Sequence, residues 1–356
     1  MKRLGKSIII FLLLVSIISC DVTSANAFTI TESKIYSVDE YDSVVQPFGS
    51  KLVAVKVDGK WGFMNSKGDL AIKTIFEDAH NFTEGLAPVL SKGKWGYINT
   101  KGKFVISAQY DEVDPSFSNG YAKVAKKGKW GIIDKNGQVI IPLKYQEVNS
   151  VGEGLIAVKI GKQYGFVNIK NKLVIPAKFE QAYMFQNGLA PVKNKGKWGY
   201  INKSGKLVIP YTYIDAESFV VNFARVVIQK GNTYFYGVIN TNGKKILETK
   251  YYQVLALKDG MAPYIYINEQ NTISMGYISL KTKKTIFKLK NLIEEFSEGY
   301  AFGGIYSGRL IDAVYDKSGA VTLLKNKYYK ASPFNNGYSV ATVNFEETSF
   351  RIIHKK

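Results

Sequence analysis

The sequence predicts an all-β fold built from tandem three-stranded β-meanders. Three observations support this: similar segments recur 34 to 39 residues apart, Tyr and Phe are abundant at 24 and 20 residues, and Asn or Asp recurs three residues before Gly. A repeat of this length is typical of stacked supersecondary units, and aromatic residues favour strands. A hydrophobic content of 46% is enough to build a core.

One junction marks the repeats. It consists of an apolar residue, two variable residues, usually Gly, and then an apolar and a small residue. It is found at residues 82–87, 117–122, 151–156, 185–190, 219–224, 257–262, 296–301 and 334–339, and a degenerate copy starts at Phe48. About eight units and a terminal strand therefore occupy residues 41–356.

A second landmark lies inside each unit, where an aromatic residue precedes Gly. It occurs at Trp61-Gly62, Trp95-Gly96, Trp130-Gly131, Tyr164-Gly165, Trp198-Gly199 and Tyr236-Gly237, with Met275-Gly276 as a further variant. This pattern resembles the WG-repeat family, whose units carry G-K-W-G-[FY]-I-[ND]. The resemblance covers about residues 41–356 and is densest over residues 51–205. Like other repeat arrays, a member of this family is expected to bind a partner.

The unit around Trp198 illustrates the expected strands, at residues 189–193, 198–202 and 206–209, the last ended by Pro210. Asn202 and Gly205 flank the second turn and suit a type I turn followed by a left-handed residue. Equivalent positions predict a positive φ at Gly102, Gly137, Gly205 and Asn171. Ser279 and Thr282 break the pattern, so an altered loop is expected there.

A meander of this size cannot bury its own face and must pack on its neighbours. The Trp of each unit is therefore expected in the core between units, and the adjacent Gly is expected to let another backbone approach. The unequal unit lengths favour an open, solenoid-like array of stacked meanders. A closed β-propeller with three strands per blade is the alternative.

The N-terminal residues are predicted to be an export signal. Lys2, Arg3 and Lys6 precede an apolar run at residues 8–18, which is too short to span a bilayer. Residues 17–20 resemble a bacterial lipobox, so residues 1–20 are read as a signal peptide, Cys20 as the lipidated residue and residues 21–40 as a tether. The alternative is ordinary cleavage after Ala27, which would release a soluble chain.

No catalytic constellation is found, so the chain is not expected to be an enzyme, and no metal or cofactor is expected. Cys20 is the only cysteine, and the two histidines, His80 and His354, lack a ligand or triad pattern. Acids follow the third strand of successive units: Glu77-Asp78, Asp111-Glu112, Glu147, Glu180 and Asp215. Because they recur with the repeat, they are read as structural, with calcium binding as a weaker alternative.

The net charge of +19 comes mostly from lysine, which argues against base-specific nucleic-acid recognition, where arginine dominates. Lysines cluster at both turns of each unit, so two basic rims with a separate acidic stripe are expected. The favoured function is a non-catalytic extracytoplasmic scaffold that displays a repeat surface to a protein or envelope partner. The alternative is a lipoprotein that binds a polyanion, either a cell-wall polymer or a phospholipid surface.

Overall fold

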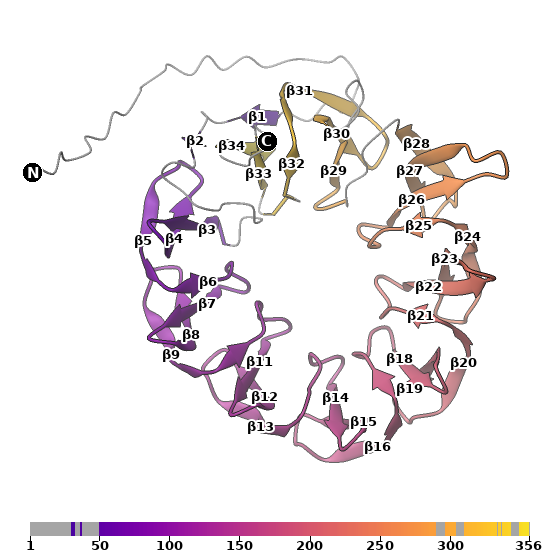
Figure 1. Ribbon diagram of the computed structural model, residues 1–356, viewed down its shortest axis with the longest axis horizontal. Helices are drawn as coiled ribbons and strands as arrows, with labels where there is room; N and C mark the ends of the chain where they lie inside the picture. The colour runs from indigo at the N-terminus through magenta and orange to yellow at the C-terminus, as the bar shows by residue number, and fades with distance from the viewer. Residues whose placement is uncertain are drawn as a thin grey trace, which may run out of the picture.

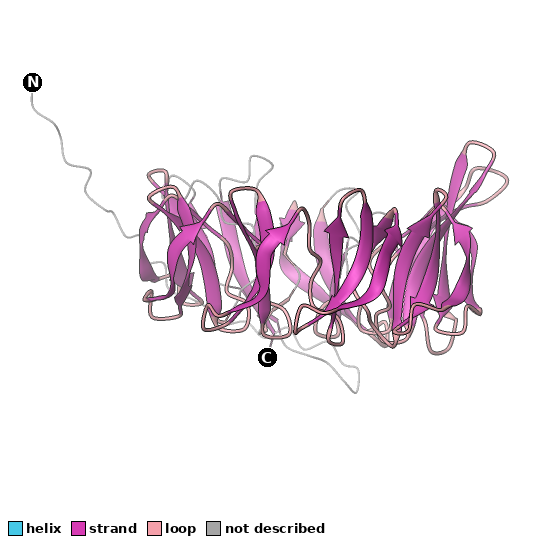
Figure 2. Cartoon of the chain, turned by 90° about the horizontal axis from the view of Figure 1, so that it is seen from below, coloured by secondary structure: helices cyan, strands magenta, loops and turns pink. Residues whose placement is uncertain are grey.

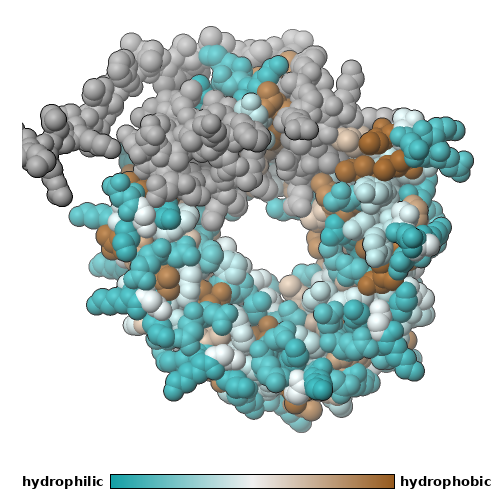
Figure 3. Space-filling model, viewed as in Figure 1, coloured by the Kyte–Doolittle hydropathy of each residue, from teal (hydrophilic) through white to brown (hydrophobic). Residues whose placement is uncertain are grey.

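The computed structural model describes residues 30–32, 36–37, 50–289, 296–303, 310–332, 334–335, 337–342 and 349–355. Within these residues the regular elements are strands, paired antiparallel into nine sheets that stand around a central opening (Figures 1 and 3). The expected signal peptide, Cys20 and the alternative cleavage site at Ala27 lie outside the described residues.

Eight of these sheets each come from one continuous stretch of chain. The first four are β3 (Leu52–Val57), β4 (Lys60–Asn65) and β5 (Leu70–Phe76); β6 (Asp78–Ala79), β7 (Leu86–Ser91), β8 (Lys94–Asn99) and β9 (Phe104–Tyr110); β10 (Glu112–Val113), β11 (Tyr121–Lys126), β12 (Lys129–Asp134) and β13 (Val139–Tyr145); and β14 (Leu155–Ile160), β15 (Gln163–Asn168) and β16 (Leu173–Phe179).

The next four sheets repeat this arrangement. They are β17 (Gln181–Ala182), β18 (Leu189–Asn194), β19 (Lys197–Asn202) and β20 (Leu207–Tyr213); β21 (Asp215–Ala216), β22 (Phe223–Lys230), β23 (Thr233–Asn240) and β24 (Lys245–Tyr251); β25 (Gln253–Val254), β26 (Met261–Ile267), β27 (Ile273–Ser279) and β28 (Thr285–Leu289); and β29 (Tyr300–Gly303), β30 (Ile311–Asp316) and β31 (Val321–Tyr328). The three-stranded meander predicted from the sequence is thus the common element.

The ninth sheet joins the two ends of the chain. It contains β1 (Ile30–Glu32), β2 (Tyr36–Ser37), β32 (Lys330–Ala331), β33 (Tyr338–Thr342) and β34 (Ser349–Lys355). Both β1 and β2 pair with β34, with Ile30 opposite Lys355 and Tyr36 opposite Phe350. The expectation of an open array is therefore wrong: the molecule is a closed β-propeller, and part of the expected 21–40 tether is strand.

The unequal unit lengths do not prevent closure because the extra residues extend hairpins. β22 and β23 have eight residues each, where β18 and β19 have six. The added residues lengthen the strands at one end of the ring, and hairpins of different height are visible in Figure 2. The angle between neighbouring sheets can stay the same while the hairpins differ, so repeat length does not distinguish an open from a closed array.

The core lies between neighbouring sheets. In five junctions, the residue after Trp-Gly, or after its Tyr or Met variant, contacts the leading Phe of the next unit, with ring centroids 4.8–5.0 Å apart. These pairs are Phe63–Phe82, Tyr97–Phe117, Phe166–Phe185, Tyr200–Phe219 and Tyr277–Phe296. Aliphatic pairs replace them at Ile132 with Val151 and at Val238 with Leu257. Aromatic and aliphatic pairs thus fill the same space between neighbouring sheets.

The glycine of each Trp-Gly pair lies against the third strand of its own sheet, at the point where that strand bulges over it; we call this the crossing strand. A Cβ atom on Gly96 would lie 2.6 Å from the carbonyl oxygen of Ile106, and one on Gly199 would lie 2.6 Å from that of Ile209. The third strand bulges at this point, since Trp95 pairs with Tyr110 but Tyr97 pairs with Ile106. The close backbone approach expected from the sequence is confirmed, and Gly62, Gly131 and Gly165 have the same surroundings.

The tryptophans pack against the core between units, but to different depths. Trp198 is buried, at 2% exposure, and so is Tyr164, but Trp61, Trp95 and Trp130 are half-buried, like Tyr236. Each follows the first turn of its unit and so lies near the end of its sheet, where the half-buried members remain partly exposed to solvent. Trp95 stacks on His80 and Trp198 on Tyr183, with centroids 5.1 and 4.9 Å apart. All four tryptophans therefore pack on the core between units, as expected, but only Trp198 is fully buried there.

The turns follow the sequence pattern closely. Gly102, Gly137, Gly205 and Asn171 all have positive φ, between 57° and 82°, as predicted. In the altered seventh unit, the Ser279 N–H donates to the carbonyl of Lys284, which makes that loop one residue longer than the turn where Asn65 bonds Asp69. The longer loop also tucks the side chain of Leu280 into the core.

Candidate binding surface at the rim end

The ring has two chemically different ends, seen edge-on in Figure 2. One end carries two sets of turns. The rim turns lead into the first long strand of each unit, and the Asn turns connect its second and third strands. Leu86 closes a rim turn and pairs with Asn99, which opens an Asn turn, so both sets lie together at what we call the rim end. The far end carries the Lys-Gly turns between the first and second strands.

The rim turns are tight two-residue hairpins whose loops point toward the centre of the ring (Figure 1). Their central residues both have positive φ, as in Glu84-Gly85 and Asn187-Gly188, the geometry of a type I′ turn. The rim turns span residues 83–86, 118–121, 152–155, 186–189, 220–223, 258–261, 297–300 and 335–338. They therefore form a circle of similar hairpins around the opening.

Neighbouring rim turns are linked by hydrogen bonds. The side chain of one turn accepts the backbone N–H of the next: Gly120 donates to Glu84 at 3.0 Å, Gly188 to Glu153 at 3.1 Å, Asn222 to Asn187 at 3.3 Å, Gly299 to Asp259 at 2.6 Å and Gly337 to Glu298 at 3.0 Å. A charged acceptor makes such bonds stronger than neutral ones. The links hold successive units in register at the rim.

Lysines of the Asn turns reach the same carboxylates. Lys203 lies 2.8 Å from Glu153, and Lys135 lies 3.9 Å from Glu84. Partial burial acts to raise the pKa of Glu153, but the bonds from Lys203 and from the Gly188 N–H outweigh it and hold that pKa below its ordinary value. The rim lysines and carboxylates therefore neutralise each other in part.

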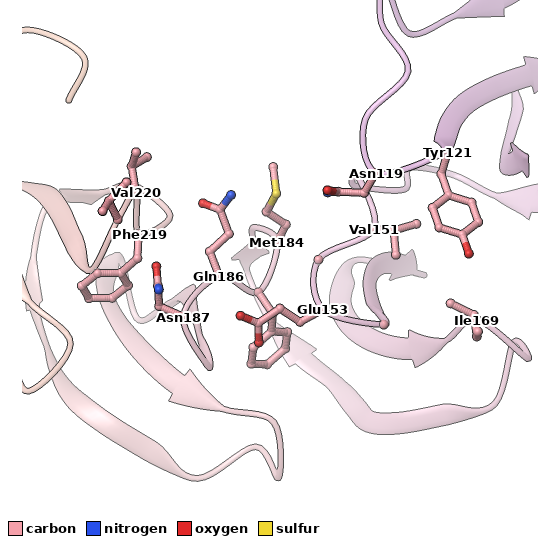
Figure 4. A pocket seen from close by; sticks show the side chains of 14 residues that line it. Asn119, Tyr121, Val151, Glu153, Ile169, Met184, Gln186, Asn187, Phe219 and Val220 are labelled. Atoms are coloured by element: carbon pink, nitrogen blue, oxygen red, sulfur yellow. The ribbon is translucent and has the colours of Figure 1, made fainter. Parts of the chain in front are cut away.

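A depression of about 690 Å³ opens between the rim turns of four consecutive units (Figure 4). Its lining residues are Asn119, Tyr121, Val151, Gly152, Glu153, Gly154, Ile169, Met184, Phe185, Gln186, Asn187, Phe219, Val220 and Val221. None of these residues was singled out from the sequence as a site. Half of them stand at the variable positions of the repeated junction, and their departures from the repeat are the signal that could have identified them.

At the far end, the recurring acids bind the Lys-Gly turns. Glu77 accepts the N–H groups of Lys92 at 2.8 Å and Gly93 at 3.0 Å, and Glu180 accepts that of Gly196 at 3.0 Å. Asp111 binds the Lys94 ammonium and the Lys127 N–H, and these bonds hold its pKa below the ordinary value. The acids are structural, as inferred, but the expected separate acidic stripe is wrong because they lie beside the lysines.

Within the described residues no group of three or more His, Cys, Asp or Glu side chains is arranged to hold a metal ion. In the same part of the chain, no helix has the length and apolar character needed to cross a membrane. Of the two histidines considered, His80 stacks on Trp95, and His354 stacks on Tyr338 with centroids 4.3 Å apart. Both therefore make ring contacts within the fold.

Comparison with solved structures shows the fold. A eukaryotic initiation factor superimposes with a TM-score of 0.57 at 10% identity, covering 87% of this chain and 89% of that one. Hsv2p of Kluyveromyces lactis matches with a TM-score of 0.40 at 14% identity, over 70% of this chain and 97% of that one. No curated protein matches the chain.

The family model described as "WG containing repeat" matches six consecutive segments, at residues 61–95, 95–130, 130–164, 164–198, 198–234 and 236–265. Each of the first five matches begins at a Trp-Gly or Tyr-Gly pair whose glycine lies under the crossing strand, and the sixth begins at Tyr236-Gly237. Together they cover more than half of the chain. The protein belongs to the WG-repeat family.

Proposed function

We propose that this protein is a non-catalytic extracytoplasmic binding scaffold that presents the rim end of its ring to a protein or envelope partner. The depression of about 690 Å³ between the rim turns is the observation that carries this proposal. Hydrogen bonds between successive turns hold its walls in place, as between Glu153 and Gly188. A preformed surface of this kind lowers the entropic cost of binding.

Site-specific photocrosslinking on intact cells tests the proposal. A photoreactive amino acid is placed at Gln186 in a rim turn, and for comparison at Lys197, which lies at the far end of the same sheet. We expect the Gln186 variant to capture one partner in stoichiometric amounts, in a complex that survives high salt. Capture from Lys197 alone, or equal capture from both positions, would contradict docking at the rim end.

The extracytoplasmic location rests on the lipobox-like residues 17–20. With Cys20 as the lipidated residue, the wild-type protein partitions into the membrane and detergent fractions. Cys20→Ala is expected to release a soluble form or to accumulate as uncleaved precursor. A processed Cys20→Ala protein that stays in the membrane fraction would contradict the lipid anchor.

Polyanion binding at the far end is the second candidate function. A depression of about 370 Å³ is lined there by three lysines, Lys129, Lys144 and Lys159. Retention on purified cell-wall material is expected to weaken between about 50 and 500 mM salt, since the Debye length shortens from roughly 14 to 4 Å. Lys129→Glu with Lys144→Glu should abolish retention, whereas Lys101→Glu at the rim end should not. No retention at the lowest salt concentration would exclude this function.

A further inference from the structure

Three apolar side chains are exposed in turns where the other units carry polar residues or Gly. In the seven Asn turns the second residue is Ser66, Thr100, Lys135, Ile169, Lys203, Thr241 or Lys317. Ile169 is the one apolar member of this set and is 43% exposed. In the rim turns Val220 and Val221 occupy the first two positions, with 40% and 65% exposure. None of the three contributes to a core cluster.

Val221 also has an unfavourable backbone conformation. Its φ is +46°, in the left-handed region, where a β-branched residue is a genuine outlier. The same position is Glu84, Asn119, Glu153, Asn187, Asp259 or Glu298 in the other described turns. A valine has no acceptor for the next turn, so the link that Glu153 makes to Gly188 cannot form from Val221. Strain of this kind is often associated with function.

The three apolar residues flank the same depression. Figure 4 shows Val220 on one side and Ile169 on the other, with Asn119, Gln186 and Met184 between them. The two amide side chains can each donate and accept hydrogen bonds. Met184 is half-buried, and its flexible thioether adapts to apolar groups of different shape. The site thus has apolar ends and a polar middle, whose one charged side chain is that of Glu153.

The charge of the lining selects among possible occupants. Although the chain carries +19, the described lining residues include no lysine or arginine. The one carboxylate, that of Glu153, already binds the Gly188 N–H and Lys203. A polyanion finds no cation among these residues. Of the aromatic rings in the lining, those of Phe185 and Phe219 are buried, and the half-buried Tyr121 packs against a core cluster, so little aromatic face is left for a sugar. The complementary occupant is uncharged, with amide groups and apolar side chains.

We propose that this depression binds an extended, uncharged polypeptide segment of the partner. Two of its apolar side chains contact Ile169 and the Val220–Val221 tip, and its backbone amides exchange hydrogen bonds with Asn119 and Gln186. This inference rests on the proposed scaffold function and specifies the class of ligand. It also accounts for a strained, exposed valine in a turn that elsewhere has a polar residue.

Selection from a phage-displayed library of random peptides on the full-length protein tests the proposal. Enriched peptides are expected to carry two apolar residues flanking an uncharged stretch. Their dissociation constants are then measured for wild type, Val221→Gly and Ile169→Lys. We expect each substitution to weaken binding by about tenfold or more, because Val221→Gly removes the buried methyl contacts and Ile169→Lys places a charged ammonium group against an apolar side chain of the peptide.

Val221→Gly separates binding from folding. Glycine accepts a φ of +46° without strain, so the midpoint of thermal unfolding should rise while peptide affinity falls. Ile75→Lys is the matched control, because Ile75 is 64% exposed on β5, away from the depression. Peptide binding should be unchanged in that variant.

Three results would overturn the peptide site: no enriched peptide, enrichment of charged sequences, or affinity that is the same in wild type and Val221→Gly. The photocrosslinked partner distinguishes this failure from that of the scaffold. If Gln186 still captures a partner and Val221→Gly leaves the yield unchanged, the scaffold function stands and the peptide site is wrong. A complex that is displaced by soluble wall glycan and not by a selected peptide would assign the depression to a sugar.

Discussion

The rings of Tyr200 and Phe219 lie 5.0 Å apart, centroid to centroid, although Tyr200 belongs to one sheet and Phe219 leads into the next. Both residues are buried, and the same contact recurs around the ring. The interface between neighbouring sheets therefore depends on these pairs more than on the tryptophans that mark the repeat.

Alanine substitutions should show that the paired core aromatics contribute more to the free energy of unfolding than the half-buried tryptophans do. Phe219→Ala is expected to reduce the free energy of unfolding by about 3–5 kcal/mol, because it leaves a cavity between sheets. Trp95→Ala should cost only about 1–2 kcal/mol, since this ring is already partly exposed to solvent. Chemical denaturation measures both values. If Trp95→Ala loses more unfolding free energy than Phe219→Ala, the tryptophan is the main contributor to the core between units, as the sequence suggested.

The equivalent tyrosines Tyr97 and Tyr200 should respond differently to removal of the hydroxyl. The Tyr200 hydroxyl donates to the carbonyl of Glu217 at 2.8 Å, whereas the buried Tyr97 hydroxyl has no hydrogen-bond partner. Burial raises the pKa of both side chains, so both stay neutral. Tyr200→Phe should cost about 1 kcal/mol and Tyr97→Phe should be neutral or stabilising. Equal losses in thermal unfolding would argue against this difference.

Gly199→Ala should be among the most damaging alanine substitutions. Its Cβ would lie 2.6 Å from the carbonyl oxygen of Ile209, so the crossing strand would have to move. We expect a loss of about 3 kcal/mol or more in unfolding free energy. Gly93→Ala is the control, because its φ is +72° and no atom lies within 4 Å of the new Cβ. It should cost only about 1–2 kcal/mol, the strain of a left-handed alanine.

Acid should weaken the carboxylate contacts at the far end. The Glu147 carboxylate accepts hydrogen bonds from Lys159 and Tyr164, which hold its pKa below the ordinary value. A lowered folded-state pKa contributes stability above the unfolded value of about 4.3, and this is lost as pH falls further through the folded value. The difference in thermal midpoint between pH 7 and pH 3 should therefore shrink in Glu147→Gln. Glu112→Gln, an exposed glutamate of the neighbouring sheet, should leave that difference unchanged.

Removing the N-terminal strands should open the ring. A chain starting at residue 41 lacks β1 and β2, so the edge of β34 loses its partners. Amide hydrogen exchange within residues 349–355 should become faster, because β34 keeps its pairing with β33 but loses the antiparallel pairing on its other edge. The sheet of β18, β19 and β20, across the ring, should keep its protection. Unchanged exchange at β34 would mean that closure does not depend on the N-terminal strands.

The sequence predicts most of the repeated parts of this structure, although the third strand runs on through Pro210 to Tyr213 where it was expected to end. Turn positions such as Gly102, Gly137 and Asn171 were predictable because a positive φ restricts which residues fit. The glycine of each Trp-Gly pair was predictable because the close approach of a backbone leaves no room for a Cβ atom. These features depend on local geometry that recurs in every unit.

Other features depend on contacts that occur once. Pairing of Ile30 with Lys355 joins residues at opposite ends of the chain and has no repeat signature, so the sequence offered the closed propeller only as the alternative to an open array. The tryptophans mark the repeat, but burial depends on distance from the end of the sheet, which sequence alone does not give. The depression was missed because its distinguishing residues, Ile169 and Val221, are departures from the repeat.

The register of the closing sheet also determines at which end of the ring the N-terminal segment enters. Tyr338 follows a rim turn and pairs with His354, and Ile30 pairs with Lys355, so the chain joins the ring at its rim end. Nine residues lie between Cys20 and Ile30, so the ten Cα–Cα steps that join them reach at most about 35 Å. A lipid on Cys20 would hold the rim end toward the bilayer and turn the lysines of the far end outward. The partner of the depression would then be found in the narrow layer between the ring and the membrane surface.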